Sequence, residues 1–345
     1  MSTLHVAIVG AGPAGGYLAG ELVRQGIDVD IYDPSHPREK PCGGVISAES
    51  LEYVPEARDL ISANPLKRLA FQTPFGRRFK VKHPRESIAV NRTEFDGYLL
   101  NRAIERGARH YAERVVGLDI REDEALVKTK NGIRQYDLVC GADGVRSIVA
   151  RAVGLSLPSK ELGYTMGGWG PVKGNKSDVV IRFGDHIGYC WVINRGDCAS
   201  IGVGGPFPQK ERVIKAFSEF CVEQSIDVDA LNPYKWVIPF SSSPSFLDKP
   251  RSGGTWLVVG DAAGFCDPLT GEGIHLALAS AHYASLAIAS GDHRSYESMW
   301  RATLGPNMQF GVQNRHLLAS RPFAESLLTM LKSNPEMGLS FFKLL

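Results

Sequence analysis

The sequence predicts an α/β protein that contains a parallel sheet, an inserted antiparallel sheet and a C-terminal run of helices. Three observations predict this fold class. A glycine-rich turn lies between an apolar run and a helical pattern in the first 32 residues. Short segments of alternating polarity fill the region from about 157 to 248. Helical apolar spacing then runs from Ile274 toward the C-terminus. The length of 345 residues suits two domains.

The N-terminal segment predicts a strand, a turn, a helix and a second strand. His5–Val9 is almost entirely apolar, which is typical of a strand buried on both faces of a parallel sheet. Ala14–Gln25 has helical apolar spacing, and Gly26 is a residue type that ends helices. Asp28–Tyr32 is again strand-like. Together these elements form one βαβ unit.

Further elements of the predicted parallel-sheet domain follow later in the chain. A helix is predicted over Thr93–Arg106, with Phe95, Leu99 and Ile104 on one side. Asp137–Gly141 and Thr255–Val259 are short apolar runs that predict buried strands of the parallel sheet.

The middle region predicts an antiparallel sheet. Its strands are expected at Val179–Phe183, Gly188–Ile193 and Ala199–Val203, with turns at Gly184-Asp185 and at 194–197. A hairpin of Leu69–Gln72 and Arg78–Lys82 around Pro74-Phe75-Gly76 is expected to join the same sheet. The antiparallel sheet is thus inserted into the first domain. We predict a discontinuous first domain of residues 1–65, 85–156 and 250–292, an inserted substrate domain of residues 66–84 and 157–249, and a C-terminal helical segment of residues 293–345.

Composition excludes several classes of function. Apolar residues make up 43% of the chain, charged residues make up 22%, and the net charge is +2. This balance gives no reason to expect a nucleic-acid partner. The six cysteines lack metal-type spacing and CxxC pairs, so neither a metal site nor a disulfide framework is predicted. The chain opens on a strand pattern rather than a leader, and we expect a cytoplasmic protein.

The turn after the first strand carries a specific binding pattern. Gly10, Gly12 and Gly15 are spaced as Gly-x-Gly-x-x-Gly between a strand and a helix. In a Rossmann-type unit, the first glycine makes the turn, the second admits a pyrophosphate and the third lets helix and strand pack closely. Asp33 follows the second strand, where a carboxylate accepts hydrogen bonds from an adenosine ribose. A glycine-rich turn without a ligand is the alternative, and this surrounding pattern disfavours it.

Two later segments distinguish FAD from NAD. The run Cys140-Gly-Ala-Asp143-Gly-Val-Arg-Ser resembles the Asp-Gly motif of FAD-dependent aromatic hydroxylases and their relatives, and Gly260-Asp261-Ala-Ala through Ile274 resembles their second FAD motif. Asn91-Arg92 also resembles that group. The resemblance implies an FAD cofactor, with a helix N-terminus after Gly271–Gly273 that stabilises reduced flavin by roughly 1–2 kcal/mol. The expected cofactor-binding residues are Gly10, Gly12, Ala14, Gly15, Asp33, Arg92, Asp143, Asp261, Gly271, Gly273 and Ile274.

Within this group the chain resembles the geranylgeranyl reductase family, which saturates isoprenoid double bonds. Lys40-Pro41-Cys42-Gly43-Gly44 is similar to the loop that lies beside the flavin ring in that family. Gly188-Tyr189-Cys190-Trp191 is similar to the strand that lines its lipid cavity, although Ile193 and Asn194 replace the family's Phe-Pro. This departure leaves the shape of the substrate open.

The resemblance implies a set of substrate contacts. Tyr189 and Trp191 are two residues apart on one strand, so they share one face of the sheet and can line a cavity. Two aromatic rings packed in an ordinary core are the alternative. Gly43 and Gly44 are the other expected substrate contacts. Cys42 is the catalytic candidate, as a thiol that positions the double bond or relays a proton; a loop thiol without a role is the alternative.

The sequence thus predicts an FAD-dependent oxidoreductase that reduces carbon–carbon double bonds of a polyprenyl or other apolar lipid-like substrate. An FAD-dependent aromatic monooxygenase and a non-catalytic flavoprotein, as electron carrier or redox sensor, are the alternatives. The sequence has no second Gly-x-Gly-x-x-Gly unit, so NADPH must bind transiently or a protein electron donor must replace it. Peripheral contact with a membrane is left open.

Overall fold

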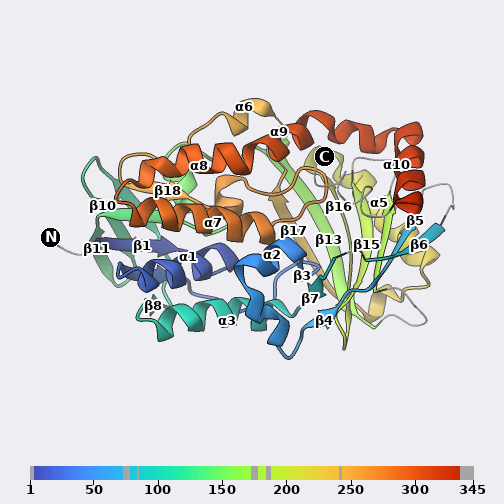
Figure 1. The fold of residues 1–345 in the computed structure, drawn as a ribbon, viewed down its shortest axis with the longest axis horizontal. Coiled ribbons are helices and arrows are strands. Elements are labelled where there is room, and N and C mark those ends of the chain that lie inside the picture. The colour runs from blue at the N-terminus through green and yellow to red at the C-terminus, as the bar shows by residue number, and fades with distance from the viewer. Residues whose placement is uncertain are drawn as a thin grey trace.

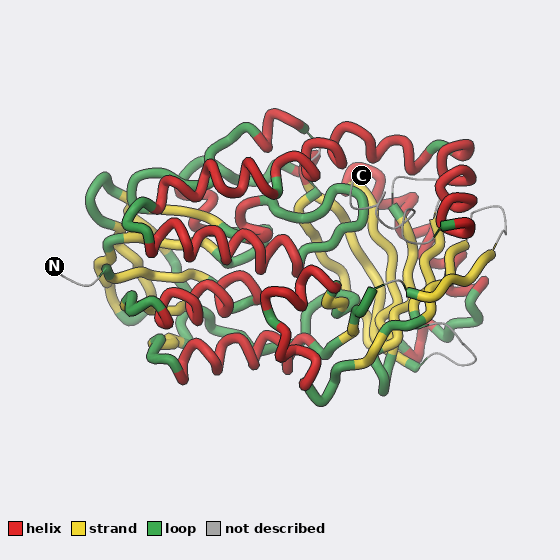
Figure 2. Tube along the Cα trace, viewed as in Figure 1, coloured by secondary structure: helices red, strands yellow, loops and turns green. Residues whose placement is uncertain are grey.

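The computed structural model describes residues 4–72, 78–83, 85–171, 178–183, 188–240 and 243–334. The molecule is elongated, with a parallel sheet near one end and a larger, mostly antiparallel sheet near the other (Figures 1 and 2). This arrangement confirms the predicted α/β fold class. Within the described ranges, none of the helices has the length and apolar character needed to cross a membrane.

The parallel sheet has five strands, in the order β18-β12-β1-β2-β8, and every neighbouring pair is parallel. The strands of this sheet are β1 (His5–Val9), β2 (Asp28–Tyr32), β8 (Arg109–Tyr111), β12 (Leu138–Gly141) and β18 (Trp256–Val258). β1 lies at the centre, and Val6, Ala7 and Ile8 are fully buried there. Burial on both faces explains why the sequence of β1 does not alternate.

Three helices pack side by side against this sheet: α1 (Pro13–Arg24), α3 (Arg92–Glu105) and α7 (Ile274–Ala289) (Figure 1). Close packing of α1 on α3 depends on small residues, since a Cβ at Gly16 would lie 3.0 Å from Leu99 Cβ. The prediction that Ile104 faces the core was wrong, because its side chain is 40% exposed. Ile104 follows Phe95 by nine residues, which places it on the opposite side of a helix with 3.6 residues per turn.

Smaller elements connect these pieces. An antiparallel sheet of β9 (Gly117–Ile120), β10 (Ala125–Thr129) and β11 (Gly132–Tyr136) precedes β12, and the sequence analysis did not predict it. Its Tyr136 hydroxyl donates to Asp30 Oδ2 at 2.6 Å and so ties it to β2. The remaining short elements are β3 (Val45–Ile46), α2 (Ala48–Tyr53), β4 (Asn64–Pro65), β7 (Ile88–Ala89), α4 (Ile148–Ala152) and α6 (Pro244–Leu247).

The larger sheet has seven strands, in the order β17-β13-β16-β15-β14-β5-β6. Its strands are β5 (Arg68–Gln72), β6 (Arg78–Lys82), β13 (Leu162–Gly170), β14 (Val179–Phe183), β15 (Tyr189–Asn194), β16 (Ala199–Pro206) and β17 (Asn232–Pro239). The predicted β5–β6 hairpin is confirmed, while its turn at 74–76 and the turn at 184–185 lie outside the described residues. The sheet is mixed rather than purely antiparallel, because β14 and β5, from distant parts of the chain, pair in parallel.

The two faces of β15 have different environments. Cys190 and Val192 pack toward α5 (Lys210–Glu223), whereas Tyr189, Trp191 and Ile193 face the opposite side. The alternation follows from the two-residue period of a strand. It confirms that Tyr189 and Trp191 share a face.

The C-terminal helices run along the molecule from the parallel sheet to the seven-stranded sheet (Figure 1). They are α8 (Tyr296–Thr303), α9 (Gly305–Asn314) and α10 (Arg321–Ser333). Leu327 and Leu328 of α10 join the same apolar cluster as Trp191. Residues 335–345 of the predicted C-terminal segment lie outside the described residues, and the predicted domain boundaries stay a prediction.

Candidate functional site

A cavity of about 1240 Å³ extends from the glycine-rich turn after β1 to the seven-stranded sheet. Its walls come from the β1–α1 turn, the loop before β3, the loop before α7 and strands β14, β15 and β17. Polar and charged groups line the end near the parallel sheet, which we call the polar end. Aromatic and aliphatic side chains line the end near the seven-stranded sheet, which we call the apolar end.

The three motif glycines at the polar end have different structural requirements. Gly10 has φ +104°, and a Cβ there would lie 2.4 Å from the Ala142 carbonyl oxygen. A Cβ at Gly15 would lie 1.9 Å from the Gly10 carbonyl oxygen. At Gly12, however, a Cβ would meet only His36 Nε2, at 3.7 Å. Protein packing therefore requires glycine at 10 and 15, whereas Gly12 keeps open a space that a phosphate group fits.

Asp33 lies at the end of β2 and is held by several donors. Its Oδ2 accepts from the Ala11 N–H at 3.0 Å and lies 2.8 Å from His36 Nδ1, and its Oδ1 accepts from the Ser35 N–H at 2.8 Å. Burial alone would raise the pKa of Asp33, but these hydrogen bonds and the His36 charge hold that pKa far below its usual range. Asp33 is thus a fixed carboxylate at the cavity wall.

His36 links Asp33 to a second buried ion pair. Its Nε2 lies 3.3 Å from Asp96 Oδ2, and the Arg92 Nε and Nη2 atoms each lie 2.8 Å from Asp96. Burial lowers the pKa of His36, but the two carboxylates outweigh it and raise that pKa above its usual value. Arg92, predicted to contact the cofactor, therefore gives two of its donors to Asp96 while still lining the cavity.

Two further predicted carboxylates face the polar end. Asp143 Oδ2 accepts from the Ile148 N–H at 2.6 Å, while its Oδ1 is buried without a hydrogen-bond partner in the described residues. Asp261 follows β18, and burial raises its pKa while Lys40 and Arg92 oppose that rise. An unpaired buried acceptor is costly, so Asp143 is placed to receive a hydrogen bond from a ligand.

The loop that carries Asp261 is held by a buried arginine. Arg251 is fully buried, and its Nε donates to the Ala263 carbonyl at 2.6 Å. Its guanidinium also stacks over the Phe246, Phe265 and Trp300 rings. Burial lowers the pKa of Arg251 to about 10. The Arg251 contacts fix the carboxyl edge of β18 without facing the cavity.

The loop that carries Cys42 lies between the two ends of the cavity. A Cβ at Gly43 would lie 2.5 Å from Ile193 Cδ1, and Gly44, with φ +74°, would place a Cβ 2.3 Å from the Val90 carbonyl oxygen. Gly44 is therefore required by its backbone conformation and packing, whereas a side chain at Gly43 would need only the end of the Ile193 side chain to move. The Cys42 thiol accepts from the Gly44 N–H at 3.3 Å and lies beside the Arg92 guanidinium.

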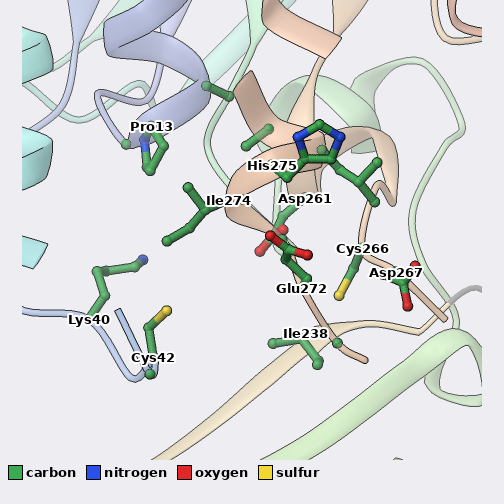
Figure 3. A pocket seen from close by; sticks show the side chains of 18 of the residues that line it. Pro13, Lys40, Cys42, Ile238, Asp261, Cys266, Asp267, Glu272, Ile274 and His275 are labelled. Atoms are coloured by element: carbon green, nitrogen blue, oxygen red, sulfur yellow. The ribbon is translucent and has the colours of Figure 1, made fainter. Parts of the chain in front are cut away.

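Lys40 and Glu272 are two cavity residues that the sequence analysis did not single out. Lys40 Nζ lies 4.8 Å from the centre of the Trp236 ring, and burial together with Arg92 and Arg38 lowers its pKa to about 8. Glu272 projects from the loop before α7 on the opposite side (Figure 3). Their neighbours in the sequence could have indicated them, since Lys40 precedes Cys42 by two residues and Glu272 lies between Gly271 and Gly273. Their place at the cavity wall, however, became evident only in the folded structure.

The apolar end is built around Trp191. Its indole Nε1 donates to Ser200 Oγ at 3.2 Å, and Ser200 Oγ donates to the Cys42 carbonyl at 3.2 Å. A Cβ at Gly202 on β16 would lie 2.4 Å from the indole, so this glycine makes room for the ring. The Tyr189 ring is 5.9 Å from that of Trp191, and its hydroxyl donates to the Thr270 carbonyl. The Ser200 bridge connects the apolar wall to the Cys42 loop.

Most of the predicted site residues meet at this cavity. Those that line it are Gly10, Gly12, Ala14, Asp33, Cys42, Gly43, Arg92, Asp143, Tyr189, Trp191, Asp261, Gly271, Gly273 and Ile274. Gly15 and Gly44 do not line it and act through backbone packing instead. The open space at Gly12, the unpaired Asp143 oxygen and the helix N-terminus of α7 all fit a dinucleotide with a flavin group.

Comparison with known proteins agrees with this geometry. Residues 3–291 match the family model described as FAD binding domain. A digeranylgeranylglycerophospholipid reductase of Methanocaldococcus jannaschii is 28% identical over 334 residues, which cover 86% of this chain and 82% of that protein.

Two solved structures share the fold. A geranylgeranyl bacteriochlorophyll reductase-like protein of Thermoplasma acidophilum superposes with a TM-score of 0.81 at 20% identity, over 96% of this chain and 92% of that chain. The flavin-dependent brominase Bmp2 superposes with a TM-score of 0.73 at 17% identity, over 99% and 93% of the two chains. These similar proteins confirm the predicted resemblance to the geranylgeranyl reductases. The chain belongs to the FAD binding domain family and is an FAD-dependent oxidoreductase.

Proposed function

We propose that this oxidoreductase reduces carbon–carbon double bonds of a polyprenyl or other apolar lipid-like substrate. One observation carries the proposal: a single cavity joins the polar end, which suits FAD, to an apolar end that suits a hydrocarbon chain. Apolar pocket walls with a few placed polar groups are typical of such sites. The names of the similar reductases point the same way. A cavity of this size beside the cofactor loops argues against a simple electron carrier.

We assign cofactor binding to residues of the polar end and substrate binding to residues of the apolar end. Bound FAD in its reduced form would supply the hydride for the double bond. The polar-end residues Gly12, Asp33, Asp143 and Asp261 would hold the dinucleotide. Tyr189 and Trp191 would hold the hydrocarbon chain against β15 and exclude water from the reacting carbons. We also propose that NADPH or a protein electron donor reduces the flavin.

Cys42 is proposed to act on the substrate where the two ends meet. The thiol lines the cavity, and Ser200 ties its loop to the Trp191 wall. This location suits a group that positions the double bond or relays a proton. Cys42→Ala is expected to leave FAD binding and photoreduction intact. In this variant the substrate should reoxidise the reduced flavin at least roughly tenfold more slowly, which corresponds to a barrier higher by about 1.4 kcal/mol. An unchanged rate would make Cys42 a spectator.

The function is tested by anaerobic reoxidation. The purified FAD-loaded protein is photoreduced without oxygen and mixed with a lipid that carries geranylgeranyl chains. We expect flavin reoxidation that depends on the lipid, and mass spectrometry should show two added hydrogen atoms for each reduced bond. Reduction of the flavin by NADPH is measured separately. Oxygen consumption with a hydroxylated aromatic product would support the monooxygenase instead, and absence of lipid-dependent reoxidation would refute the proposal.

A further inference from the structure

Glu272 is held in place by the loop that precedes α7. Asp267 N–H donates to the Glu272 carbonyl at 2.9 Å, and the Glu272 N–H donates to Thr270 Oγ1 at 3.2 Å. Gly271 beside it has φ +68°, a backbone conformation that favours glycine. The Tyr189 hydroxyl binds the Thr270 carbonyl from β15. The loop is thus anchored by backbone and side-chain contacts, so the Glu272 backbone has a defined position at the cavity wall.

The Glu272 carboxyl lies in an environment that favours its protonated form. Its Oε1 is buried without a hydrogen-bond partner in the described residues, and no cation contributes to its pKa. Burial raises the pKa of Glu272 to about 7, the Asp267 charge adds to the rise, and the Ser47 hydroxyl opposes it. The other titratable groups that sense its charge are Cys266, from the same loop, and Tyr189, from β15.

Glu272 faces the cavity from the side opposite Cys42. Figure 3 shows Lys40 and Cys42 on one side of this space and Glu272, Asp261 and Cys266 on the other. Glu272 and Cys42 both line the same cavity. A substrate that lies along the Tyr189 and Trp191 wall would extend toward the space between them.

We propose that Glu272 is the general acid that protonates the substrate when a double bond is reduced. The inference rests on the proposed function. Reduced flavin would supply a hydride, which forms a C–H bond at one alkene carbon as the π bond breaks. The electron pair of that π bond takes the proton of the Glu272 carboxyl, so a second C–H bond forms at the other carbon and the O–H bond breaks to leave a carboxylate. Water then reprotonates the carboxylate, and a nicotinamide or protein donor returns two electrons to the flavin.

Neighbouring groups are less suited to this task. Asp267 Oδ1 already accepts from the Leu269 N–H, the Thr270 N–H and the Thr270 hydroxyl, at 2.7–2.9 Å. Burial raises the pKa of Asp261 as well, but Asp261 faces Lys40 and Arg92, whose charges oppose that rise and favour its carboxylate. Burial lowers the pKa of His275 and raises the pKa of Cys266 well above its usual value. A general acid works best with a pKa near the operating pH, and Glu272 meets this condition.

The test uses FAD-loaded Glu272→Gln, which keeps the size of the side chain and removes the acid. We expect unchanged FAD content and photoreduction, and lipid-dependent reoxidation slower by about 100-fold. In the unaltered protein the rate should fall as pH rises above about 7, whereas the variant should show no such fall. Glu272→Asp should restore part of the rate. Glu105→Gln, at an exposed glutamate of α3 that does not line the cavity, is the control and should keep its rate.

Infrared spectroscopy gives a readout that does not depend on turnover. The unaltered protein should show a protonated carboxyl band at about pH 6 that is lost by about pH 8, and Glu272→Gln should lack this band. A rate of Glu272→Gln equal to that of the unaltered protein, or the same pH profile, would overturn the inference alone. Failure of the unaltered protein to reduce any alkene would overturn the proposed function, and with it this role of Glu272.

Discussion

The polar and apolar ends of the cavity are built in different ways. At the polar end, Gly10, Gly12 and Gly15 belong to one turn, and a Cβ at Gly10 or Gly15 would first meet backbone atoms. At the apolar end, Trp191 depends on Ser200 and Gly202 of the neighbouring strand and belongs to the same apolar cluster as Leu327 and Leu328 of helix α10. A binding site formed by backbone atoms of one turn can be predicted from a short sequence motif. A binding site formed by packed side chains cannot be predicted in this way, because it depends on how distant segments of the chain pack together.

The difference extends to what each glycine permits. At Gly10 and Gly15 an added Cβ would collide with backbone oxygen atoms, which cannot move without unfolding the turn. At Gly202 the collision is with an indole ring, which belongs to a side chain. Substitutions at the polar end are therefore expected to remove the fold or the cofactor, whereas substitutions at the apolar end should reshape the pocket.

The largest expected effect tests the polar end. Gly15→Val should destabilise the protein by at least about 4 kcal/mol, because its Cβ has no space beside the Gly10 carbonyl. Gly12→Ala is the matched variant. It should leave the thermal unfolding of the FAD-free protein within about 1 kcal/mol of the unaltered value while sharply lowering FAD content, since its Cβ meets no protein atom closer than 3.7 Å.

Thermal unfolding without FAD and flavin absorbance after purification measure the two effects. Full FAD content in folded Gly12→Ala would show that the open space is not a phosphate site.

An intermediate effect tests the apolar end. Trp191→Ala should destabilise the protein by about 3 kcal/mol through the lost packing of a buried indole. FAD should still bind, because the change lies at the other end of the cavity, and lipid binding should weaken. Trp191→Phe keeps an aromatic ring and loses the bond to Ser200 and part of the packed volume, so its loss should be smaller, about 1–2 kcal/mol. Loss of FAD in Trp191→Ala would mean that the two ends are not independent.

The smallest expected effect is a pH dependence that belongs to the polar end. His36 has a raised folded-state pKa, so its stabilisation is fully present below its unfolded pKa of about 6.5 and is lost as pH rises through the folded value. Stability should therefore fall above about pH 6.5, by no more than about 1.4 kcal/mol per pH unit. Denaturant unfolding measured at several pH values should show that the unfolding free energy of His36→Gln falls less steeply with pH than that of the unaltered protein. An equal fall in both proteins would exclude His36 as the cause of the pH dependence.

Much of the fold was predictable because it depends on local patterns. The βαβ unit, the β5–β6 hairpin and helix α7 follow from apolar periodicity and from residues that make turns. The shared face of Tyr189 and Trp191 follows from the strand period alone. The sheet of β9–β11 was missed, and its Tyr136 bond to Asp30 spans 106 residues, a contact that no local pattern signals.

The sequence by itself determined the glycine turn and the acidic residue after β2, since these depend on backbone conformation and spacing within a few residues, whereas the expected place of Cys42 came from the resemblance of its loop to that of the reductase family. Only the tertiary structure decided that β14 pairs in parallel with β5, that Ser200 joins Trp191 to the Cys42 loop, and that the Glu272 Oε1 atom is buried with no cation contributing to the pKa of its carboxyl. The physical reason is that burial and pairing depend on what the rest of the chain places around a residue. The pKa of a carboxyl group is set by that environment.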